Sequence, residues 1–312
     1  MYNFQHKPVM LEQAIASLNV RKNLNYIDAT FGMGGYTKKI LESAKCSLIS
    51  IDQDPEVIIY AKKIKENYNS NFTFVSDSFN NIIPIINNNK LNGINGGIVA
   101  DLGFSSMQIE NAERGFSFMR DGPLDMRMSK KGQTAKDLIY SISEKELSEI
   151  LWKYGEEKQS KAIARIIINA RKNENIDGTF KLVELIKRVK KNSGKSKTHP
   201  ATKTFQALRI SVNQELKVLK DFLKNCEKIL MPGARLVIVT FHSLEDRIVK
   251  VFFNELIGKE SNSNRHLPNI FKKKIIKFKK INKKPLFPDY IEIRKNNRAR
   301  SAKIRTIERL CE

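Results

Sequence analysis

The stretch "NYIDATFGMGGYT" (residues 25–37) decides the fold of this chain. It starts as an apolar run of strand type, passes through three glycines within four positions, and continues into a segment with helical character. A buried strand, a glycine-rich turn and a helix, in that order, are typical of the first unit of a doubly wound α/β sheet. We therefore expect a cofactor to lie against this turn.

Four further apolar runs repeat the strand signal. Each is short and nearly continuously apolar, as expected for strands of a parallel sheet that is covered on both faces. They are residues 46–52, 72–77, 96–103 and 234–242. Between the first four strands we expect helices at 35–44, 55–67 and 79–88. This alternation predicts βαβ units.

The interval between the fourth and fifth strands is too long for an ordinary crossover, at about 130 residues. It contains two capping-box sequences, "TAKD" (134–137) and "SEKE" (143–146), which predict helix starts. One long helix is expected at 202–230. We therefore predict a sheet domain formed by residues 1–104 and 216–312, and an inserted helical domain at residues 105–215.

The charge of the chain suggests a polyanionic partner. Lys and Arg number 56 against 33 Asp and Glu, which gives a net charge of +23 and an isoelectric point of about 9.8. Nucleic acid is a common partner of such proteins. Stretches rich in Lys, Asn and Ile together are also typical of genomes biased toward A and T, so the charge only supports this interpretation.

Cysteine and histidine usage argues against a metal site. The three cysteines are far apart, and the four histidines lack metal-ligand spacing, so we expect reduced thiols and no metal. No apolar run approaches the roughly 18 residues of a membrane span, and the first residues lack a secretory signal pattern. We therefore expect a cytoplasmic protein.

Three kinds of ligand loop compete for the glycine stretch. A P-loop is excluded because no Gly-Lys-Ser/Thr follows the glycines. In a dinucleotide loop, Thr37 would stand where the last glycine belongs. In an S-adenosylmethionine loop, Asp28, four residues before Gly32, would meet the amino group of the cationic ligand. Asp52, twenty residues after Gly32, suits ribose hydroxyls in either class. The loop spacing favours the methyl donor.

Longer motifs resemble a known family over nearly the whole chain. They are "DLGFSSMQ" (101–108), "AERGFSFMRDGPLDMRM" (112–128), "YGEE" (154–157), "HPATKTFQALRI" (199–210), "FHSLEDRIVK" (241–250) and "NRARSAKIR" (297–305). These motifs resemble the bacterial 16S ribosomal RNA cytosine-N4 methyltransferases. The resemblance implies a class I, Rossmann-like methyltransferase sheet of α/β class with an inserted all-helical domain that recognises substrate. It also implies methylation of a cytidine in the decoding region of the rRNA.

The cofactor and partners follow from the same resemblance. It implies S-adenosyl-L-methionine as cofactor and 16S rRNA, or the small ribosomal subunit, as partner. The cofactor contacts that it implies fall on Gly34, Gly35, Tyr36, Asp52, Phe79, Asp101 and Gln108. Tyr36 stands where many members have His, and Met107 and Asn297 replace prolines of the family pattern.

Methyl transfer to an amine needs a proton acceptor. Cytosine N4 is a poor nucleophile, because its lone pair is delocalised into the ring. The candidate acceptors are Asp101, at the end of the fourth strand, and Asp125. Asp101 is equally compatible with positioning the cofactor alone, and Asp125 with pairing to Arg120 or Arg127.

Three further residues have both a functional and a structural interpretation. Phe116 and Phe118 would stack on a flipped-out base or belong to the core. His242 would face the substrate, or lie in a helix start formed by Ser243 with Asp246.

RNA contacts are expected at the basic C-terminal end of the chain. Arg298, Arg300 and Lys303 suit phosphates, against the alternative of a solvated tail. Three other functions stay open: a class I methyltransferase acting on another base or on protein, a nucleotide-dependent oxidoreductase, and a non-enzymatic RNA-binding protein. The sequence leaves the oligomeric state unknown.

Overall fold

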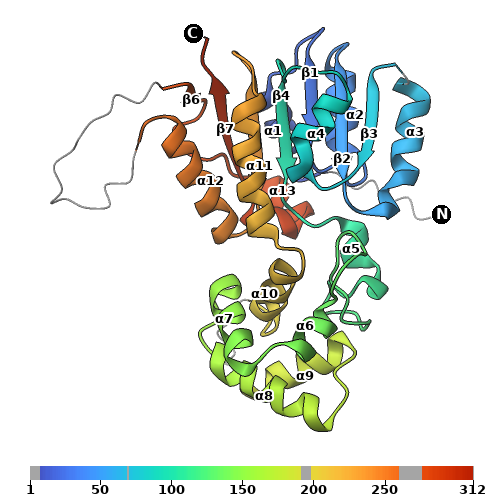
Figure 1. Cartoon of the computed structure of the whole chain (residues 1–312), viewed down its shortest axis with the longest axis vertical. Coiled ribbons are helices and arrows are strands. Elements are labelled where there is room, and N and C mark those ends of the chain that lie inside the picture. The colour runs from blue at the N-terminus through green and yellow to red at the C-terminus, as the bar shows by residue number, and fades with distance from the viewer. Residues whose placement is uncertain (1–7, 69, 191–197, 260–275, 312) are drawn as a thin grey trace, which may run out of the picture. The chain divides into compact units, whose positions relative to one another are not determined.

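The computed structural model describes residues 8–68, 70–190, 198–259 and 276–311. The chain divides into two compact units (Figure 1). One consists of Met1–Gly103 with Leu216–Glu312, which we call the sheet unit, and the other is Phe104–Glu215, the helical unit. In the described part of the chain, no helix is long and apolar enough to cross a membrane.

The sheet unit is built on one seven-stranded sheet in the order β3-β2-β1-β4-β5-β7-β6 (Figure 1). The strands are β1 (Asn25–Asp28), β2 (Ser47–Asp52), β3 (Phe72–Ser76), β4 (Gly97–Asp101), β5 (Arg235–Thr240), β6 (Phe278–Lys280) and β7 (Lys303–Arg309). The first five are parallel, whereas β7 runs antiparallel to both β5 and β6. The five predicted strands and the α/β class are therefore confirmed.

Helices lie between the strands as the alternation predicted. In the sheet unit they are α1 (Leu11–Leu18), α2 (Gly35–Ser43), α3 (Ile58–Tyr68), α4 (Ile82–Asn88), α11 (Glu215–Ile229), α12 (Ser243–Leu256) and α13 (Tyr290–Lys295). Short 3-10 turns η1 (Pro55–Val57) and η2 (Phe79–Asn81) precede α3 and α4, and η4 (Asn297–Ser301) precedes β7.

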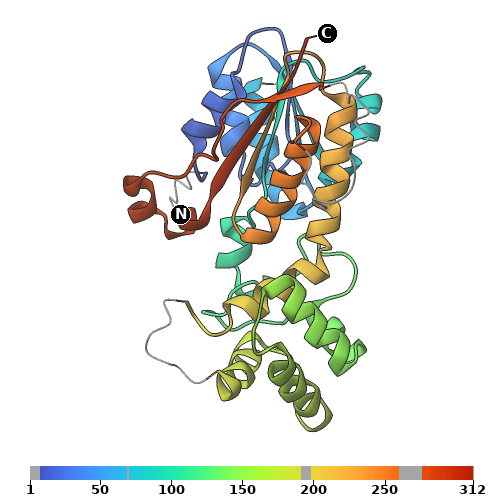
Figure 2. The same cartoon turned by 90° about the vertical axis from the view of Figure 1, so that its left-hand side faces the viewer.

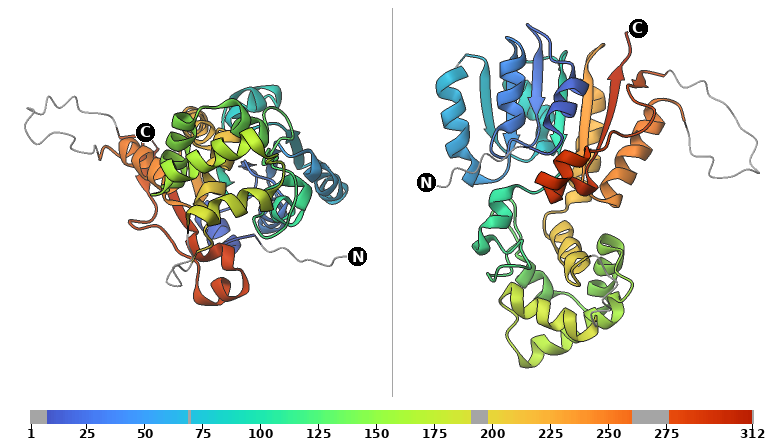
Figure 3. Two further views of the ribbon diagram at one scale, coloured as in Figure 1. Left: turned by 90° about the horizontal axis from the view of Figure 1, so that it is seen from below. Right: turned by 180° about the vertical axis from the view of Figure 1, so that it is seen from behind.

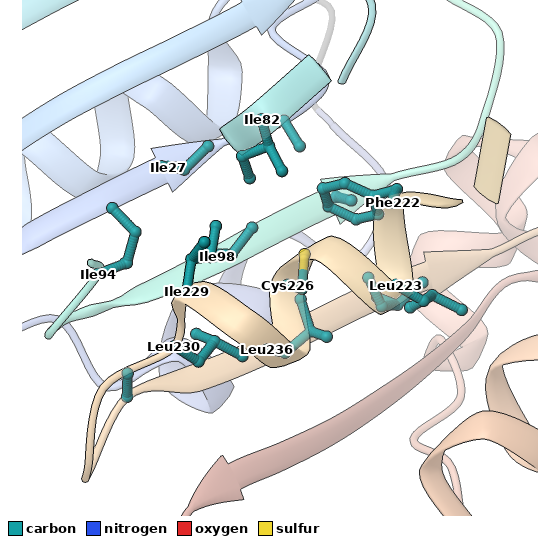
Figure 4. Packing of buried hydrophobic residues seen from close by; sticks show 14 of the residues in the cluster. Ile27, Ile82, Ile94, Ile98, Phe222, Leu223, Cys226, Ile229, Leu230 and Leu236 are labelled. Atoms are coloured by element: carbon teal, nitrogen blue, oxygen red, sulfur yellow. The ribbon is translucent and has the colours of Figure 1, made fainter. Parts of the chain in front are cut away.

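One face of the sheet packs against α4, α11 and α12 (Figure 4). Ile98 of β4 and Leu236 of β5 share a cluster with Phe222 and Cys226 of α11. The next residue of β4, Val99, lies outside this cluster and is also completely buried. Both sheet faces are thus covered, and this is why the strand runs lack polar alternation.

The helical unit consists of several short helices (Figures 2 and 3), and its buried apolar side chains form a core of its own. Its elements are α5 (Ser106–Glu110), η3 (Ala112–Arg114), α6 (Ala135–Ser141), α7 (Glu144–Gly155), α8 (Ser160–Asn173), α9 (Thr179–Val189) and α10 (Thr202–Val212). Both predicted capping boxes are confirmed, at Thr134 with Asp137 and at Ser143 with Glu146. They satisfy backbone N–H groups at the starts of α6 and α7.

The predicted single helix over 202–230 is wrong. It breaks after α10, because Gln214 adopts a left-handed conformation with φ of 50°. The Asn213 side chain fixes the break: its amide donates to the Met126 carbonyl over 2.8 Å, and its oxygen accepts from the Met128 N–H over 2.8 Å. Those two bonds depend on a loop more than eighty residues upstream, which helical periodicity does not reveal.

Candidate functional site

Three carboxyl groups stand at the carboxyl ends of neighbouring parallel strands. Asp28 ends β1, Asp52 ends β2 and Asp101 ends β4. Open α/β sheets bind ligands at this edge. Burial raises the pKa of Asp28 and of Asp52 to about 6, and that of Asp101 to about 7. The edge therefore holds acids that gain from a positively charged ligand.

The glycine loop between β1 and α2 is shaped by close packing. Gly34 has φ of 79°, and a Cβ on it would lie 2.4 Å from the Ile64 side chain. A Cβ on Gly35 would lie 2.1 Å from Pro8. Gly32 differs, because the space around its Cβ position is open to at least 4 Å. The loop therefore presents an open side at Gly32 and packs tightly at the other two glycines.

Asp52 ties this loop to the end of β2. One oxygen accepts from the Gly32 N–H over 2.7 Å, and the other accepts from the Asp54 N–H over 2.9 Å. A carboxylate offers about four acceptor positions, so capacity is left for ligand hydroxyls. The predicted ribose contact at Asp52 is compatible with this geometry and stays a prediction.

Asp28 is completely buried. Its two oxygens accept from the Thr37 hydroxyl over 2.7 Å and from the Thr30 N–H over 3.2 Å. Thr37 in turn shares a hydrogen bond of 2.6 Å with Ser50. These bonds direct the carboxyl group into the base of the loop, and the expected direct contact with a ligand amino group stays a prediction.

Asp101 is held by the backbone and by Tyr36. Its Oδ1 accepts from the Gly103 N–H over 2.9 Å, and its own N–H donates to the Thr30 hydroxyl over 2.7 Å. The Tyr36 hydroxyl has one proton and faces two acceptors: it donates to the Val9 carbonyl over 2.5 Å, and the Asp101 carboxyl group, whose pKa it lowers, competes for the same proton. Burial raises the pKa of Tyr36 well above its usual value. Sequence reasoning missed this contact, since no local pattern joins residues 36 and 101.

Phe79 is the first residue of η2, shortly after the end of β3. It is half-buried, and its ring lies edge-on to Phe222 with a centroid distance of 4.8 Å. The side chain therefore joins α11 to the same sheet edge, and its predicted cofactor contact stays a prediction.

Two predicted site residues lie in the helical unit. The Gln108 oxygen accepts from the Ser105 N–H over 3.0 Å and completes the capping box of α5. Asp125 forms a two-pronged ion pair with Arg127, with distances of 2.9 and 2.6 Å. Although burial raises the pKa of Asp125, the hydrogen bonds from Arg127 outweigh it and lower that pKa overall. Of the two predicted arginine partners, Arg127 is the one that pairs.

The phenylalanines of the 112–128 motif differ from each other. Phe116 is 8% exposed and belongs to the core of the helical unit. Phe118 is half-buried and stacks on the ring of His199, with centroids 4.7 Å apart and planes 5° apart. The core alternative therefore holds for Phe116.

The whole chain is similar to known methylases. The model of the MraW methylase family matches residues 3–310. This chain belongs to that family. The ribosomal RNA small subunit methyltransferase H of Rickettsia canadensis is 45% identical over 313 residues, covering 98% of both chains. Its counterpart from Rickettsia prowazekii is 44% identical over 306 residues, again covering 98% of both.

A solved structure gives a looser similarity. It is a putative methyltransferase from Streptococcus mutans in complex with SAH, with a TM-score of 0.41 and 14% identity, covering 98% of this chain and all of that one. The full-length family match confirms the resemblance seen in the motifs. The chain is thus an S-adenosylmethionine-dependent methyltransferase.

In this MraW-family chain the three predicted RNA contacts fall into two groups. Arg298 and Arg300 lie in η4 and are exposed. Lys303 is the first residue of β7, and its ammonium lies 3.0 Å from Asp246. Arg305 binds the same carboxylate, with Nε 2.6 Å from Oδ1. The solvated-tail alternative is wrong for β7, since this part of the motif forms a strand between β5 and β6.

The start of α12 also differs from the prediction. The cap is His242, not Ser243: its ring nitrogen accepts from the Glu245 N–H over 3.4 Å. Glu245 accepts from the Phe241 N–H over 2.8 Å. Asp246, expected in the cap, instead holds Lys303 and Arg305. His242 is therefore occupied as a helix cap of this methylase fold.

Proposed function

We propose that this methyltransferase transfers a methyl group to N4 of a cytidine in the decoding region of 16S ribosomal RNA. The observation that carries the proposal is the carboxyl edge of the sheet, where three acids have raised pKa values, in a chain that matches the MraW methylase family over residues 3–310. Relatives at 44–45% identity carry the name of ribosomal RNA small subunit methyltransferase.

The residues of the sheet edge fit S-adenosylmethionine. When bound, this cofactor supplies an electrophilic methyl group on a positively charged sulfur. Burial raises the pKa values of Asp52 and Asp101, and a positively charged ligand beside them would favour their charged forms. The open space beside Gly32 leaves room against the loop. The proposed contacts are Gly34, Gly35, Tyr36, Asp52, Phe79, Asp101 and Gln108.

We assign different tasks to the two accessible acids of this edge. Asp52, which already orders the Gly32 backbone, accepts ribose hydroxyls. Asp101 accepts an N–H of the target amine, so that the nitrogen lone pair is directed toward the methyl group. Because burial raises its pKa to about 7, Asp101 also suits the removal of a proton near neutral pH.

Asp125 is the weaker candidate for proton acceptor. Its pKa is lowered, and both its oxygens are held by Arg127. A carboxylate in that state is a poor base near neutral pH. We propose that it orders the 112–128 loop of the helical unit through Arg127.

RNA recognition is assigned to the helical unit, proposed as the substrate-recognition domain, and to the end of the chain. Arg298 and Arg300 are exposed and suit phosphate contacts that position the strand. Lys303 is a weaker proposed contact, because Asp246 already neutralises it. The proposed partner is the small ribosomal subunit in the cytoplasm, and transfer from a sulfonium needs no metal.

The test is mass mapping of modified nucleosides in small-subunit rRNA, with and without this protein. We expect one N4-methylated cytidine in the decoding region that depends on the chain. A methyl group on another base would favour the alternative methyltransferase, and RNA binding without any methyl transfer would favour the pure RNA-binding protein. An Asp101→Asn variant run in parallel provides the matched inactive control.

A further inference from the structure

Three large apolar side chains are exposed within five residues of the sheet unit. Phe287, Tyr290 and Ile291 expose 60%, 71% and 64% of their surface. α13, to which two of them belong, has no buried residue. Single exposed apolar residues are ordinary on protein surfaces, but a cluster of this kind marks an interaction site.

This cluster lies at the carboxyl edge of the parallel strands, the same edge that carries Asp52 and Asp101 and the proposed site of the methyl donor. Lys303, at the start of β7, pairs with Thr240, at the end of the parallel strand β5. α13 and η4 immediately precede Lys303, and they therefore lie at the carboxyl edge of the parallel strands. The right panel of Figure 3 shows them in red at that edge.

Hydrogen bonds connect α13, through residues 9 and 10, to the start of α2, which follows the glycine loop. Glu292 of α13 accepts from the Met10 N–H over 2.5 Å. The neighbouring Val9 carbonyl accepts from the Tyr36 hydroxyl, which also contacts Asp101. A substrate strand held on α13 would therefore lie on an element fixed to the donor site within the same unit.

Positive charge accompanies the apolar cluster. The Arg294 guanidinium lies 5.6 Å from the centre of the Tyr290 ring, and Lys295, Arg298 and Arg300 follow within six residues. The acids of this segment are engaged in the fold, since Asp289 caps α13 and Glu292 holds Met10. Protein–protein interfaces are depleted of charge at their centres, whereas aromatic rings interleaved with cations suit single-stranded nucleic acid.

We propose that Phe287, Tyr290, Ile291 and Arg294 form a stacking platform for unpaired nucleotides that flank the target cytidine. This inference rests on the proposed function. A base whose amine is methylated has to leave the stack, and its neighbours then lose a stacking partner. Aromatic rings and guanidinium planes replace that partner for any base.

The test compares RNA with and without bases. The parent and a Phe287→Ala/Tyr290→Ala variant are titrated with a labelled single-stranded RNA, and with an abasic ribose-phosphate chain of the same length. We expect the variant to bind the RNA roughly 5- to 150-fold more weakly, from the usual contribution of one stacked base. Binding of the abasic chain should hardly change. Tyr290→Phe keeps the ring and should bind as the parent does.

Ile59→Ala provides a control, because Ile59 is 57% exposed on α3 and lies far along the sheet from α13. Unchanged RNA affinity, or equal weakening for both chains, would overturn the platform. Reduced self-association in sedimentation with unchanged RNA affinity would show a contact between copies instead. Methyl transfer by the parent to 16S rRNA is measured alongside. An inactive parent overturns the proposed function. An active parent whose platform variants bind RNA as tightly as the parent does overturns the platform alone.

Discussion

The Tyr36 hydroxyl lies between two acceptors, the backbone carbonyl of Val9, to which it donates, and the Asp101 carboxyl group, which competes for the same proton. One phenol thus connects the helix after the glycine loop, the end of β4 and the segment before α1. Burial has the larger effect and raises the pKa of Asp101, and hydrogen bonding from the Tyr36 hydroxyl opposes it by lowering that pKa. Tyr36 therefore tunes the acid that we propose as proton acceptor.

Replacing Tyr36 with Phe should shift the pH dependence of turnover. Without the hydroxyl the pKa of Asp101 rises further, so the ionised acceptor appears only at higher pH. The acid limb of the kcat profile should move to higher pH, with Tyr60→Phe on α3 as the control. An acid limb that stays in place, in a variant with the parent's thermal midpoint, would separate Tyr36 from the titration of Asp101.

Asp101→Asn should lower turnover much more than cofactor affinity. The amide keeps the shape and one acceptor oxygen, but it cannot take a proton. We expect kcat to fall by the 10²–10⁴-fold typical of losing a general base, while the Kd for S-adenosylmethionine changes far less. If kcat and affinity fell in proportion, Asp101 would be a cofactor ligand only.

Asp52→Ala should weaken cofactor binding. Two hydrogen bonds from the ribose to a charged acceptor would be lost, at roughly 1.5–3 kcal/mol each. The Gly32 and Asp54 N–H groups would lose their acceptor as well, which loosens the loop. Calorimetric titration measures the change, and Asp54→Ala is the neighbouring control. Parent-like affinity in a folded variant would remove Asp52 from the proposed site.

The buried Asp28 should make the stability of the sheet unit depend on pH. Its pKa is raised to about 6 when folded, so the folded state binds a proton more tightly than the unfolded state. The resulting stabilisation is complete below the unfolded pKa of about 4 and is lost as pH rises through about 6. Two pKa units correspond to on the order of 2–3 kcal/mol.

Asp28→Asn tests this directly, because an amide keeps an acceptor for Thr37 and does not titrate. Between pH 5 and pH 8 the parent's urea midpoint should fall more steeply than the variant's. Parallel slopes would mean that Asp28 stays charged in the folded protein. Cofactor-free protein is needed, since a bound cation would itself lower the pKa values at this edge.

The sequence predicted best what is local in the chain. The five parallel strands follow from continuous apolar runs, and the caps at Thr134 and Ser143 follow from four-residue patterns. β7 was missed, although "KIRTIER" alternates in the manner of a strand, because its cations favoured a basic tail. The contacts of Tyr36 with Asp101 and of Met10 with Glu292 join distant segments, and no spacing in one sequence encodes them.

The last prediction concerns the basic residues near the end of the chain. Arg298 and Arg300 are exposed in η4, whereas the Lys303 ammonium lies 3.0 Å from the Asp246 carboxylate. Cations that contact phosphates release counterions, so the logarithm of RNA affinity falls with the logarithm of salt concentration. The slope is about −0.7 for each contact with a single strand. Removing two such contacts in Arg298→Ala/Arg300→Ala should flatten the slope by about 1.4 and leave S-adenosylmethionine affinity nearly unchanged.

Lys303→Ala is the matched comparison for that experiment. Its ammonium is bound to Asp246, which retains Arg305 through two hydrogen bonds when the lysine is removed. We therefore expect a nearly parental salt slope, with a small loss in thermal midpoint because a partly exposed ion pair is broken. Affinity measured from low to moderate salt distinguishes the two variants. If Lys303→Ala flattened the slope and the arginine pair did not, the phosphate contacts would lie along β7, and η4 would be a structural turn.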